Sequence, residues 1–240
     1  MPEGGPRCGG RVTAAVVMAA AITIGMKQPM PPLPDALIYA AALAGGYLLG
    51  SIPFGYIAAK MAGIDIRTVG SGNIGATNVL RTGRKDLAAV TFIGDTGKGA
   101  AAVGLAFALL LSRDVTTRQT AMALAGAAAF LGHLYPVWLK FKGGKGVATF
   151  MGTLMAAAWP MGIIAAGVWL VTAFIFRISS FSALVAAALV VPLAFLLHVG
   201  PYPFLGMALF MAVLIYVRHR DNIRRLLKGE EPKIGKKNEA

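Results

Sequence analysis

The sequence predicts an all-α membrane protein, a helical bundle of about seven transmembrane helices. Hydrophobic residues make up 57% of the 240 residues, only 14% are charged, and the mean hydropathy is +0.68. Soluble domains carry about 25% charged residues. Several apolar runs approach the roughly 20 residues that a helix needs to cross a bilayer. These observations together place the chain among polytopic membrane proteins.

The expected helices follow from the lengths of the apolar runs and from the residues that interrupt them. Gly50-Ser51-Ile52-Pro53 lies inside the first span, where proline kinks a helix. Pro160 divides a run that is too long for one span and too short for two. The predicted helices are 36–61, 87–111, 120–139, a short helix from 150 to about 158, a second to about 176, 183–197 and 204–217.

The two ends of the chain are expected to lie outside the bundle. Residues 1–35 contain an apolar run at the low end of spanning length, followed by a proline-rich piece, and we predict a signal-like extension or a mis-assigned start. Residues 36–228 form the predicted membrane domain, and 229–240 a basic tail. Cys8 is the single cysteine, so an intrachain disulfide is excluded.

We attribute the net charge of +13 to the orientation of the chain in the membrane rather than to a surface that binds nucleic acid. Basic residues gather in 62–86, in 140–147, at Arg177 and in the tail, and cytoplasmic loops carry an excess of Lys and Arg. The C-terminus is therefore expected to be cytoplasmic. The expected partners are an anionic substrate and membrane lipids, with no nucleic acid.

A glycine-rich polar loop, Gly70 to Arg81, is the first candidate site. Glycines let backbone N–H groups turn toward an anion, and an arginine fork matches phosphate oxygens. The G-x-G-x-x-G spacing of Gly70, Gly72 and Gly75 does not indicate a dinucleotide site, because a long apolar helix precedes it. A solvated loop between helices is the alternative. The candidate phosphate-binding residues are Ser71, Gly72, Asn73, Gly75, Thr77, Asn78 and Arg81.

A second candidate lies at Lys142, Gly143, Gly144 and Lys145, where interleaved glycines suggest close backbone approach. A simple topology anchor is the alternative. Asp95 and Lys98 lie three residues apart, on one face of a predicted span. Ionisable groups inside a span usually face a site or each other, so a self-neutralising pair is the alternative there.

Several of these segments resemble the motifs of bacterial acyl-phosphate:glycerol-3-phosphate acyltransferases, the PlsY family. The match covers about 36–228, and the N-terminal extension departs from it. The residues that carry the resemblance are Gly50-Ser51-Ile52-Pro53, Ser71 to Arg81, Asp95 to Gly99, Gly132-His133 with Pro136, Lys142 to Thr149, Ser179-Ser180, Arg218-His219 and Asp221-Asn222-Ile223.

The resemblance implies a multi-span enzyme of the bacterial plasma (inner) membrane. It would move a fatty acyl group from acyl phosphate to the 1-hydroxyl of glycerol 3-phosphate, giving lysophosphatidic acid and phosphate. The resemblance also implies phosphate binding by Arg81 and Lys145, with hydrogen bonds from Ser71, Gly72 and Ser180. His219 and Asn222 would position the glycerol hydroxyls, and Asp95, Lys98 and His133 would shape the acyl-phosphate side or assist proton transfer.

No cofactor and no metal is expected, because acyl phosphate is already activated and no cluster of metal ligands stands out. A transporter of phosphate or an organic phosphate is the alternative function. A transporter should show repeated halves and charges near the midplane. The sequence has no evident internal repeat, and its polar motifs fall on one predicted face.

Overall fold

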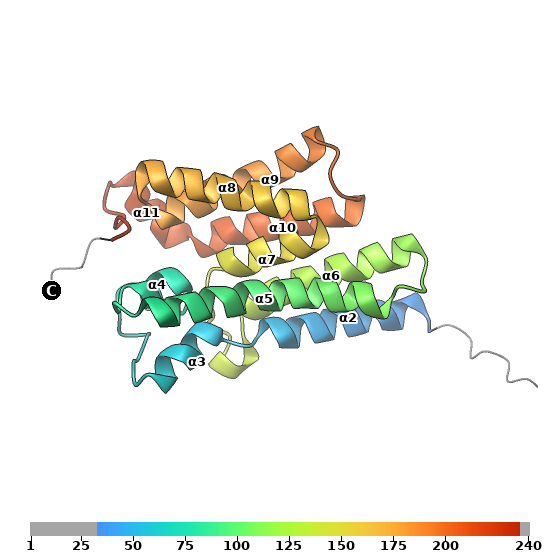
Figure 1. The fold of residues 1–240 in the computed structure, drawn as a ribbon, viewed down its shortest axis with the longest axis horizontal. Helices are drawn as coiled ribbons and strands as arrows, with labels where there is room; N and C mark the ends of the chain where they lie inside the picture. Colours follow the sequence, from blue (N-terminus) through green and yellow to red (C-terminus); the bar gives the residue numbers. More distant parts are fainter. Residues whose placement is uncertain (1–32, 236–240) are drawn as a thin grey trace, which may run out of the picture. The chain divides into compact units, whose positions relative to one another are not determined.

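The computed structural model describes residues 33–235, which form a bundle of α-helices without β-strands in that range (Figure 1). The predicted extension, 1–35, therefore lies almost entirely outside the described residues. The elements are α2 (Asp35–Gly50), α3 (Phe54–Met61), α4 (Ala76–Leu80), α5 (Lys85–Leu109), α6 (Val115–Leu134), the 3-10 turn η1 (Val137–Leu139), α7 (Val147–Ala157), α8 (Trp159–Phe176), α9 (Ser179–Leu196), α10 (Tyr202–Arg218) and α11 (Arg220–Leu227).

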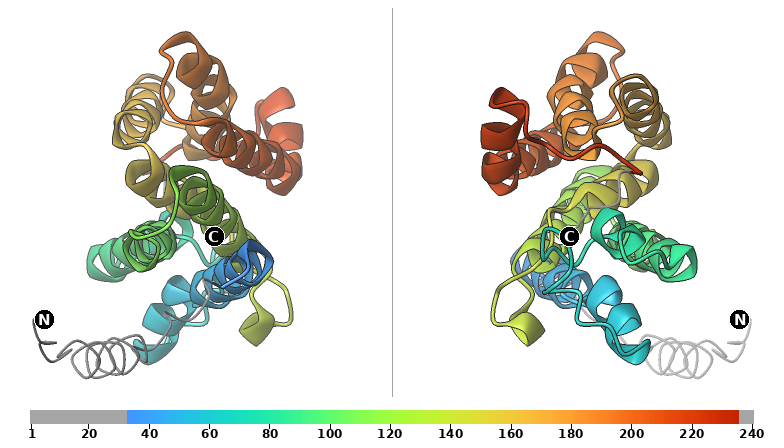
Figure 2. Two further views of the ribbon diagram at one scale, coloured as in Figure 1. Left: turned by 90° about the vertical axis from the view of Figure 1, so that its right-hand side faces the viewer. Right: turned by 90° about the vertical axis from the view of Figure 1, so that its left-hand side faces the viewer.

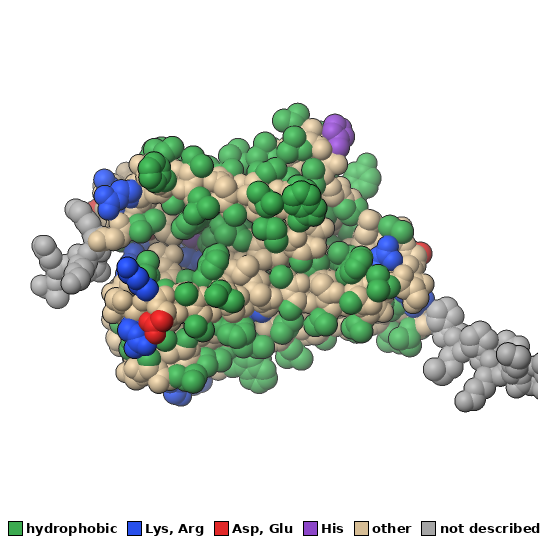
Figure 3. All heavy atoms as spheres, in the orientation of Figure 1, with side chains coloured by type: hydrophobic (Ala, Val, Ile, Leu, Met, Phe, Trp, Pro, Cys, Tyr) green, Lys and Arg blue, Asp and Glu red, His purple; other side chains and the backbone are tan. Residues whose placement is uncertain are grey.

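Every predicted span corresponds to a helix or a broken pair of helices. By length and composition, four segments of the described range qualify as membrane spans, or five if the bent pair α10 and α11 is included. The long helix α5 carries ionisable residues, and α7 has only 11 residues. The predicted number of seven is thus approximate, whereas the all-α class is confirmed. Hydrophobic side chains cover the middle of the helices in Figure 3, and Lys and Arg side chains lie toward the ends.

Several helix boundaries differ from the predicted ones. α6 begins at Val115 rather than 120, and three further differences have a local cause. The first span is interrupted at 51–53, between α2 and α3, where proline cannot donate a backbone hydrogen bond. α6 ends at Leu134 rather than 139, because Pro136 follows at once. α9 begins at Ser179 rather than 183, and the Ser182 hydroxyl donates to the Ile178 carbonyl at 2.9 Å in its first turn.

α6 and α7 lie at the centre of the packing. α6 contacts α2, α5, α7 and α10, while α7 contacts α5, α6, α8 and α10. The end-on views of Figure 2 show α6 and α7 between α2 and α5 on one side and α8 to α10 on the other. Small residues permit the closest approaches: a Cβ at Gly50 would overlap the carbonyl group of Ala129, and one at Gly152 would overlap that of Thr96.

The predicted polar segments meet at one end of the helices. Arg67 donates to the Lys142 carbonyl, Lys145 to the Asn222 side chain, and the hydroxyls of Thr77 and Ser179 lie 3.2 Å apart. In Figure 1 this is the end where α3, α4 and α11 lie. The α5–α6 connection lies at the opposite end, where Thr117 donates to Asp35 at 3.1 Å. The predicted convergence of the motifs on one face is therefore observed.

The α2–α6 contact provides a direct test of the packing. Gly50→Val should lower the free energy of unfolding by about 3 kcal/mol, at the upper end for overpacking, because the new side chain meets backbone rather than a movable side chain. Gly45→Val is the matched control, since no atom lies within 4 Å of a Cβ built there. Thermal unfolding in detergent measures both. Equal stability of the two variants would contradict the close approach.

Candidate active site

The loop between α3 and α4 is organised by the buried side chain of Asn78. Its amide nitrogen donates to the carbonyls of Val69 at 2.9 Å and Ile66 at 3.3 Å. Its oxygen accepts from the Ser71 backbone N–H at 3.0 Å. Gly70 has a φ of +53°, and a Cβ there would crowd the Asn78 side chain. Asn78, predicted to bind phosphate, thus holds the shape of the loop.

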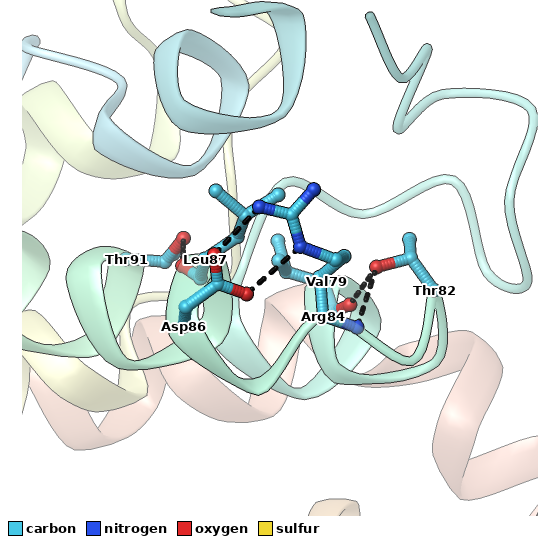
Figure 4. Close-up of polar contacts among 6 residues, drawn as sticks. All are labelled: Val79, Thr82, Arg84, Asp86, Leu87 and Thr91. Carbon is cyan, nitrogen blue, oxygen red and sulfur yellow. Dashed lines mark hydrogen bonds and ion pairs between the residues drawn. The ribbon is translucent and has the colours of Figure 1, made fainter. Parts of the chain in front are cut away.

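Arg81 lies at the C-terminal end of α4, next to the connection from α4 to α5. Figure 4 shows this turn: the Thr82 hydroxyl donates to the Val79 carbonyl at 2.7 Å, and Arg84 pairs with Asp86 at 2.6 Å. Arg81 itself is exposed, and its guanidinium lies 3.4 Å from the Asn78 oxygen. The loop therefore offers Arg81 to solvent at the end of the helices where the motifs meet.

The second loop, Lys140 to Gly146, is held against α6 and α10. The N–H groups of Gly143 and Gly144 donate to the carbonyls of Leu134 and His133 at 3.0 and 3.1 Å. Arg218 donates to the carbonyls of Gly144 and Gly143, each at 3.2 Å. A Cβ at Gly144 would overlap the His133 ring. Both glycines are needed for this close approach, and their N–H groups are engaged within the protein.

A cavity of about 300 Å³ opens where the two loops meet the α10–α11 corner. Its wall includes three arginines and Lys145, together with three residues of the first loop that were predicted to bind phosphate, Ser71, Gly72 and Asn73. Its lining residues are Arg67, Ser71, Gly72, Asn73, Tyr135, Gly143, Lys145, Val217, Arg218, Arg220 and Asp221. A polar, cationic cavity of this kind suits a small anion.

Lys145 is a partly buried cation of the cavity wall, and its ammonium donates to the side-chain oxygen of Asn222. Burial lowers the pKa of Lys145 to about 8, and the positive charges of Arg225, Arg81 and Arg218 act in the same direction, while Glu231 opposes them. Lys145 is therefore charged at neutral pH and loses its proton as the pH rises through about 8.

His219 and Asn222 occupy the α10–α11 corner beside Lys145, and both are buried. The Nδ1 atom of His219 lies 2.8 Å from the Ile215 carbonyl, which only accepts hydrogen bonds, so Nδ1 carries the proton. Nε2 is then left as an acceptor. The Asn222 amide nitrogen and the Ser180 hydroxyl both donate to Glu231, so these two predicted site residues belong to one network with Glu231 and Lys145.

Asp95, Lys98 and His133 form a buried group behind the second loop rather than a part of the cavity wall. Lys98 lies 2.8 Å from the Asp95 carboxylate, and His133 Nδ1 lies 3.5 Å from it. Lys98 also donates to the Ile52 carbonyl at 2.8 Å, in the break between α2 and α3. This group connects α5, α6 and that break, directly beneath Gly144.

Other predicted residues lie at the margin. Thr77 meets Ser179, Gly75 caps α4, and Lys142 is exposed and contributes its carbonyl to Arg67. Sequence reasoning did not assign Arg67, Tyr135 or Glu231 to the site. The guanidinium of Arg218 lies 5.4 Å from the centre of the Tyr135 ring, and the Tyr135 carbonyl accepts from Tyr47 at 2.8 Å. Arg218 was not assigned to the site either, but its place next to His219 in the sequence was a signal that could have identified it.

The fold and the cavity define a helical membrane protein with a polar, cationic cavity at one end of its helices. A model of the glycerol-3-phosphate acyltransferase family matches residues 40–229. The chain belongs to this family.

Relatives and solved structures agree with that assignment. A glycerol-3-phosphate acyltransferase of Caulobacter vibrioides is 65% identical over 201 residues, 83% of this chain and 89% of the relative. One of Paramagnetospirillum magneticum is 58% identical over 198 residues, 82% of this chain and 94% of the relative. The crystal structure of PlsY, an integral membrane glycerol 3-phosphate acyltransferase in its glycerol 3-phosphate form, is 37% identical with a TM-score of 0.75, covering 82% of this chain and 96% of that one.

These similarities and the apolar helices make the chain a multi-pass membrane protein, as the sequence predicted. A second PlsY structure, the lysophosphatidic acid form, matches at 36% identity and a TM-score of 0.73, over 82% of this chain and 95% of that one.

The buried group of Asp95, Lys98 and His133 predicts a stability effect that is separate from any activity. Asp95→Asn should lower the free energy of unfolding by about 3 kcal/mol or more, because Lys98 keeps its charge in the interior without a carboxylate. Asp86→Asn is the matched control on the same helix, since Asp86 pairs with Arg84 at the surface. Thermal unfolding in detergent should separate the two variants clearly. If they melt together, the buried pair is not a stabilising contact.

Proposed function

We propose that the cavity binds glycerol 3-phosphate and that the protein transfers an acyl group to it from acyl phosphate. The observation that carries this proposal is the meeting of the two glycine-rich loops and the α10–α11 corner around one cationic cavity. The family and its solved PlsY structures, in glycerol 3-phosphate and lysophosphatidic acid forms, support the same substrate and product.

The reaction needs few protein groups, because the donor is already activated. The 1-hydroxyl oxygen of glycerol 3-phosphate forms a bond to the acyl carbon, and the bond from that carbon to the phosphate oxygen breaks. The hydroxyl proton is released, and inorganic phosphate leaves with the bonding electrons. Binding in one geometry and stabilising phosphate charge are the contributions that a protein can make to such a step.

The residue roles combine the contacts with the sequence motifs, since Lys145 lines the cavity whereas Arg81 and His219 do not. Arg81 and Lys145 neutralise phosphate, Arg81 as a planar fork and Lys145 as a point charge. The Nε2 atom of His219 accepts a hydrogen bond from a glycerol hydroxyl, because its Nδ1 atom is committed to the Ile215 carbonyl. Arg67 and Arg218 hold the second loop from its carbonyl side, so that Lys145 is kept at the cavity.

The cavity end of the helices is proposed to face the cytoplasm of a bacterial inner membrane, with the C-terminus on the same side. The excess of Lys and Arg in the cavity-end loops supports this orientation. Reporter fusions placed after Lys228 and at Ser112 test it. A fusion at Ser112 that reports the cytoplasm would contradict the arrangement.

An assay with purified protein tests the activity directly. Palmitoyl phosphate and labelled glycerol 3-phosphate should give labelled lysophosphatidic acid, whereas palmitoyl thioesters should not replace the donor. Proteoliposomes loaded with buffer alone provide the test of the transporter alternative. Uptake of glycerol 3-phosphate without any acylated product would overturn the proposed reaction.

Phosphate recognition by Arg81 predicts a kinetic effect. Arg81→Lys keeps the charge and loses the bidentate geometry, and a hydrogen bond to a charged group contributes about 1.5–3 kcal/mol, so kcat/KM should fall at least about tenfold. If Arg81 holds glycerol 3-phosphate, KM for that substrate should rise more than KM for acyl phosphate. Arg84→Lys is the matched control, because Arg84 is exposed and paired with Asp86.

Lys145 should respond differently from Arg81. Lys145→Ala should nearly abolish activity. Lys145→Arg should lose less activity, provided that the surrounding glycines leave room for the larger guanidinium group. Well-folded Arg81→Lys and Lys145→Ala proteins with unchanged kinetics would show that the loops do not bind substrate.

A further inference from the structure

A carboxylate from the C-terminal segment lies within the network of the candidate active site. Glu231 accepts hydrogen bonds from Ser180 Oγ and Arg225 Nε, each at 2.7 Å, and from the Asn222 amide nitrogen. The Glu231 side chain is only 5% exposed, although it lies in the segment that was expected to be a basic tail. A buried carboxylate among site residues calls for a role.

The backbone after α11 is shaped to bring Glu231 inward. Gly229 has a φ of +72°, which reverses the chain after the helix, and the Glu230 N–H donates to the Arg225 carbonyl at 2.8 Å. Three residues beyond Glu231, the Ile234 N–H donates to the Arg177 carbonyl at the α8–α9 corner, at 2.6 Å. The segment 228–234 is therefore tied on both sides of Glu231, and we call it the C-terminal strap.

The contacts of Glu231 set the orientation of the Asn222 amide. Because the amide nitrogen donates to Glu231, the amide oxygen faces Lys145 and accepts from its ammonium. A reversed amide would place its NH₂ group against the Lys145 cation. One amide group thus separates the Glu231 carboxylate from Lys145. The carboxylate favours the charged form of Lys145, whereas the positive charges of Arg225, Arg81 and Arg218 disfavour it.

We propose that Glu231 is a positioning residue of the active site, whose carboxylate fixes the Asn222 amide and supplies the negative charge facing Lys145. This inference rests on the proposed function, since it assigns Lys145 to substrate phosphate. The inference also assigns the C-terminal strap to the active site, because Glu231 lies within it. Glu231 acts through Asn222, Ser180 and Lys145.

The pH profile of kcat/KM for glycerol 3-phosphate, at saturating acyl phosphate, provides the test. In the unmodified protein, kcat/KM should fall as the pH rises above about 8, because Lys145 loses its proton there. Lys145→Arg stays charged and should remove this alkaline fall, which assigns it to Lys145.

Glu231→Gln should move the alkaline fall to lower pH by about 1 unit, because an opposite charge that favoured the Lys145 cation is gone. Arg225→Gln should move it to higher pH, because a like charge is removed. Glu230→Gln is the matched control: Glu230 is the exposed neighbour in the same strap, and its profile should equal that of the unmodified protein. The position of the fall does not depend on how much protein is folded, so a poor yield of one variant leaves the test valid.

The outcomes separate the two proposals. If the unmodified protein makes no lysophosphatidic acid, the proposed function fails. If it is active but Glu231→Gln and Arg225→Gln both keep its alkaline fall in place, the role of Glu231 is refuted and the function stands. A lower KM for glycerol 3-phosphate in Glu231→Gln would also refute it, since the carboxylate would then compete with substrate phosphate.

Discussion

The site depends on the position of the Gly143-Gly144 backbone against α6. The two N–H groups bond to carbonyls at the end of α6, and the His133 ring leaves no room for a side chain at Gly144. Arg218 and Arg67 hold the carbonyl side of the same loop from α10 and from the loop after α3. Four parts of the chain thus contact one another at residues 142–144, and Lys145 is the next residue along the chain. Displacing this backbone would move Lys145 away from Asn222 and open the cavity.

The second constraint is electrostatic. Lys145, Arg81, Arg218 and Arg225 repel one another, and burial of Lys145 adds to the cost of its charge. An incoming phosphate relieves this repulsion, which gives an empty cationic site a strong preference for a dianion. Glu231 offsets part of the repulsion before substrate arrives. The buried Asp95–Lys98 pair, in contrast, is neutral as a unit and braces the helices below the loop.

The sequence predicted the helices well because their signals are local. Apolar length located the spans, and Pro160 located the break between α7 and α8, whereas Pro53 predicted only a kink where the structure has a full break between α2 and α3. The start of α9 was placed too late because three serines read as a break, although a serine hydroxyl can bond back to a helix carbonyl. Glycines with cations likewise indicated both loops from composition alone.

The other site residues could not be predicted from the sequence, because their contacts leave no pattern in the neighbouring residues. Arg67 and Tyr135 act through backbone carbonyls, a contact that leaves no pattern in the sequence. Glu231 lies in a stretch whose composition is that of a solvated tail, and its partner Ser180 is 51 residues away. The glycine N–H groups were expected to face an anion. Those of Gly143 and Gly144 instead donate to carbonyls of α6, because the loop backbone packs directly against that helix.

The central claim is that substrate phosphate lies in the cavity between the two glycine-rich loops and the α10–α11 corner. A structure determined with glycerol 3-phosphate tests it most directly. The account predicts density for the phosphate group within hydrogen-bonding distance of Lys145, with the glycerol hydroxyls toward His219 and the C-terminal strap still in place. Ordered glycerol 3-phosphate at any other position, with this cavity empty, would contradict the account.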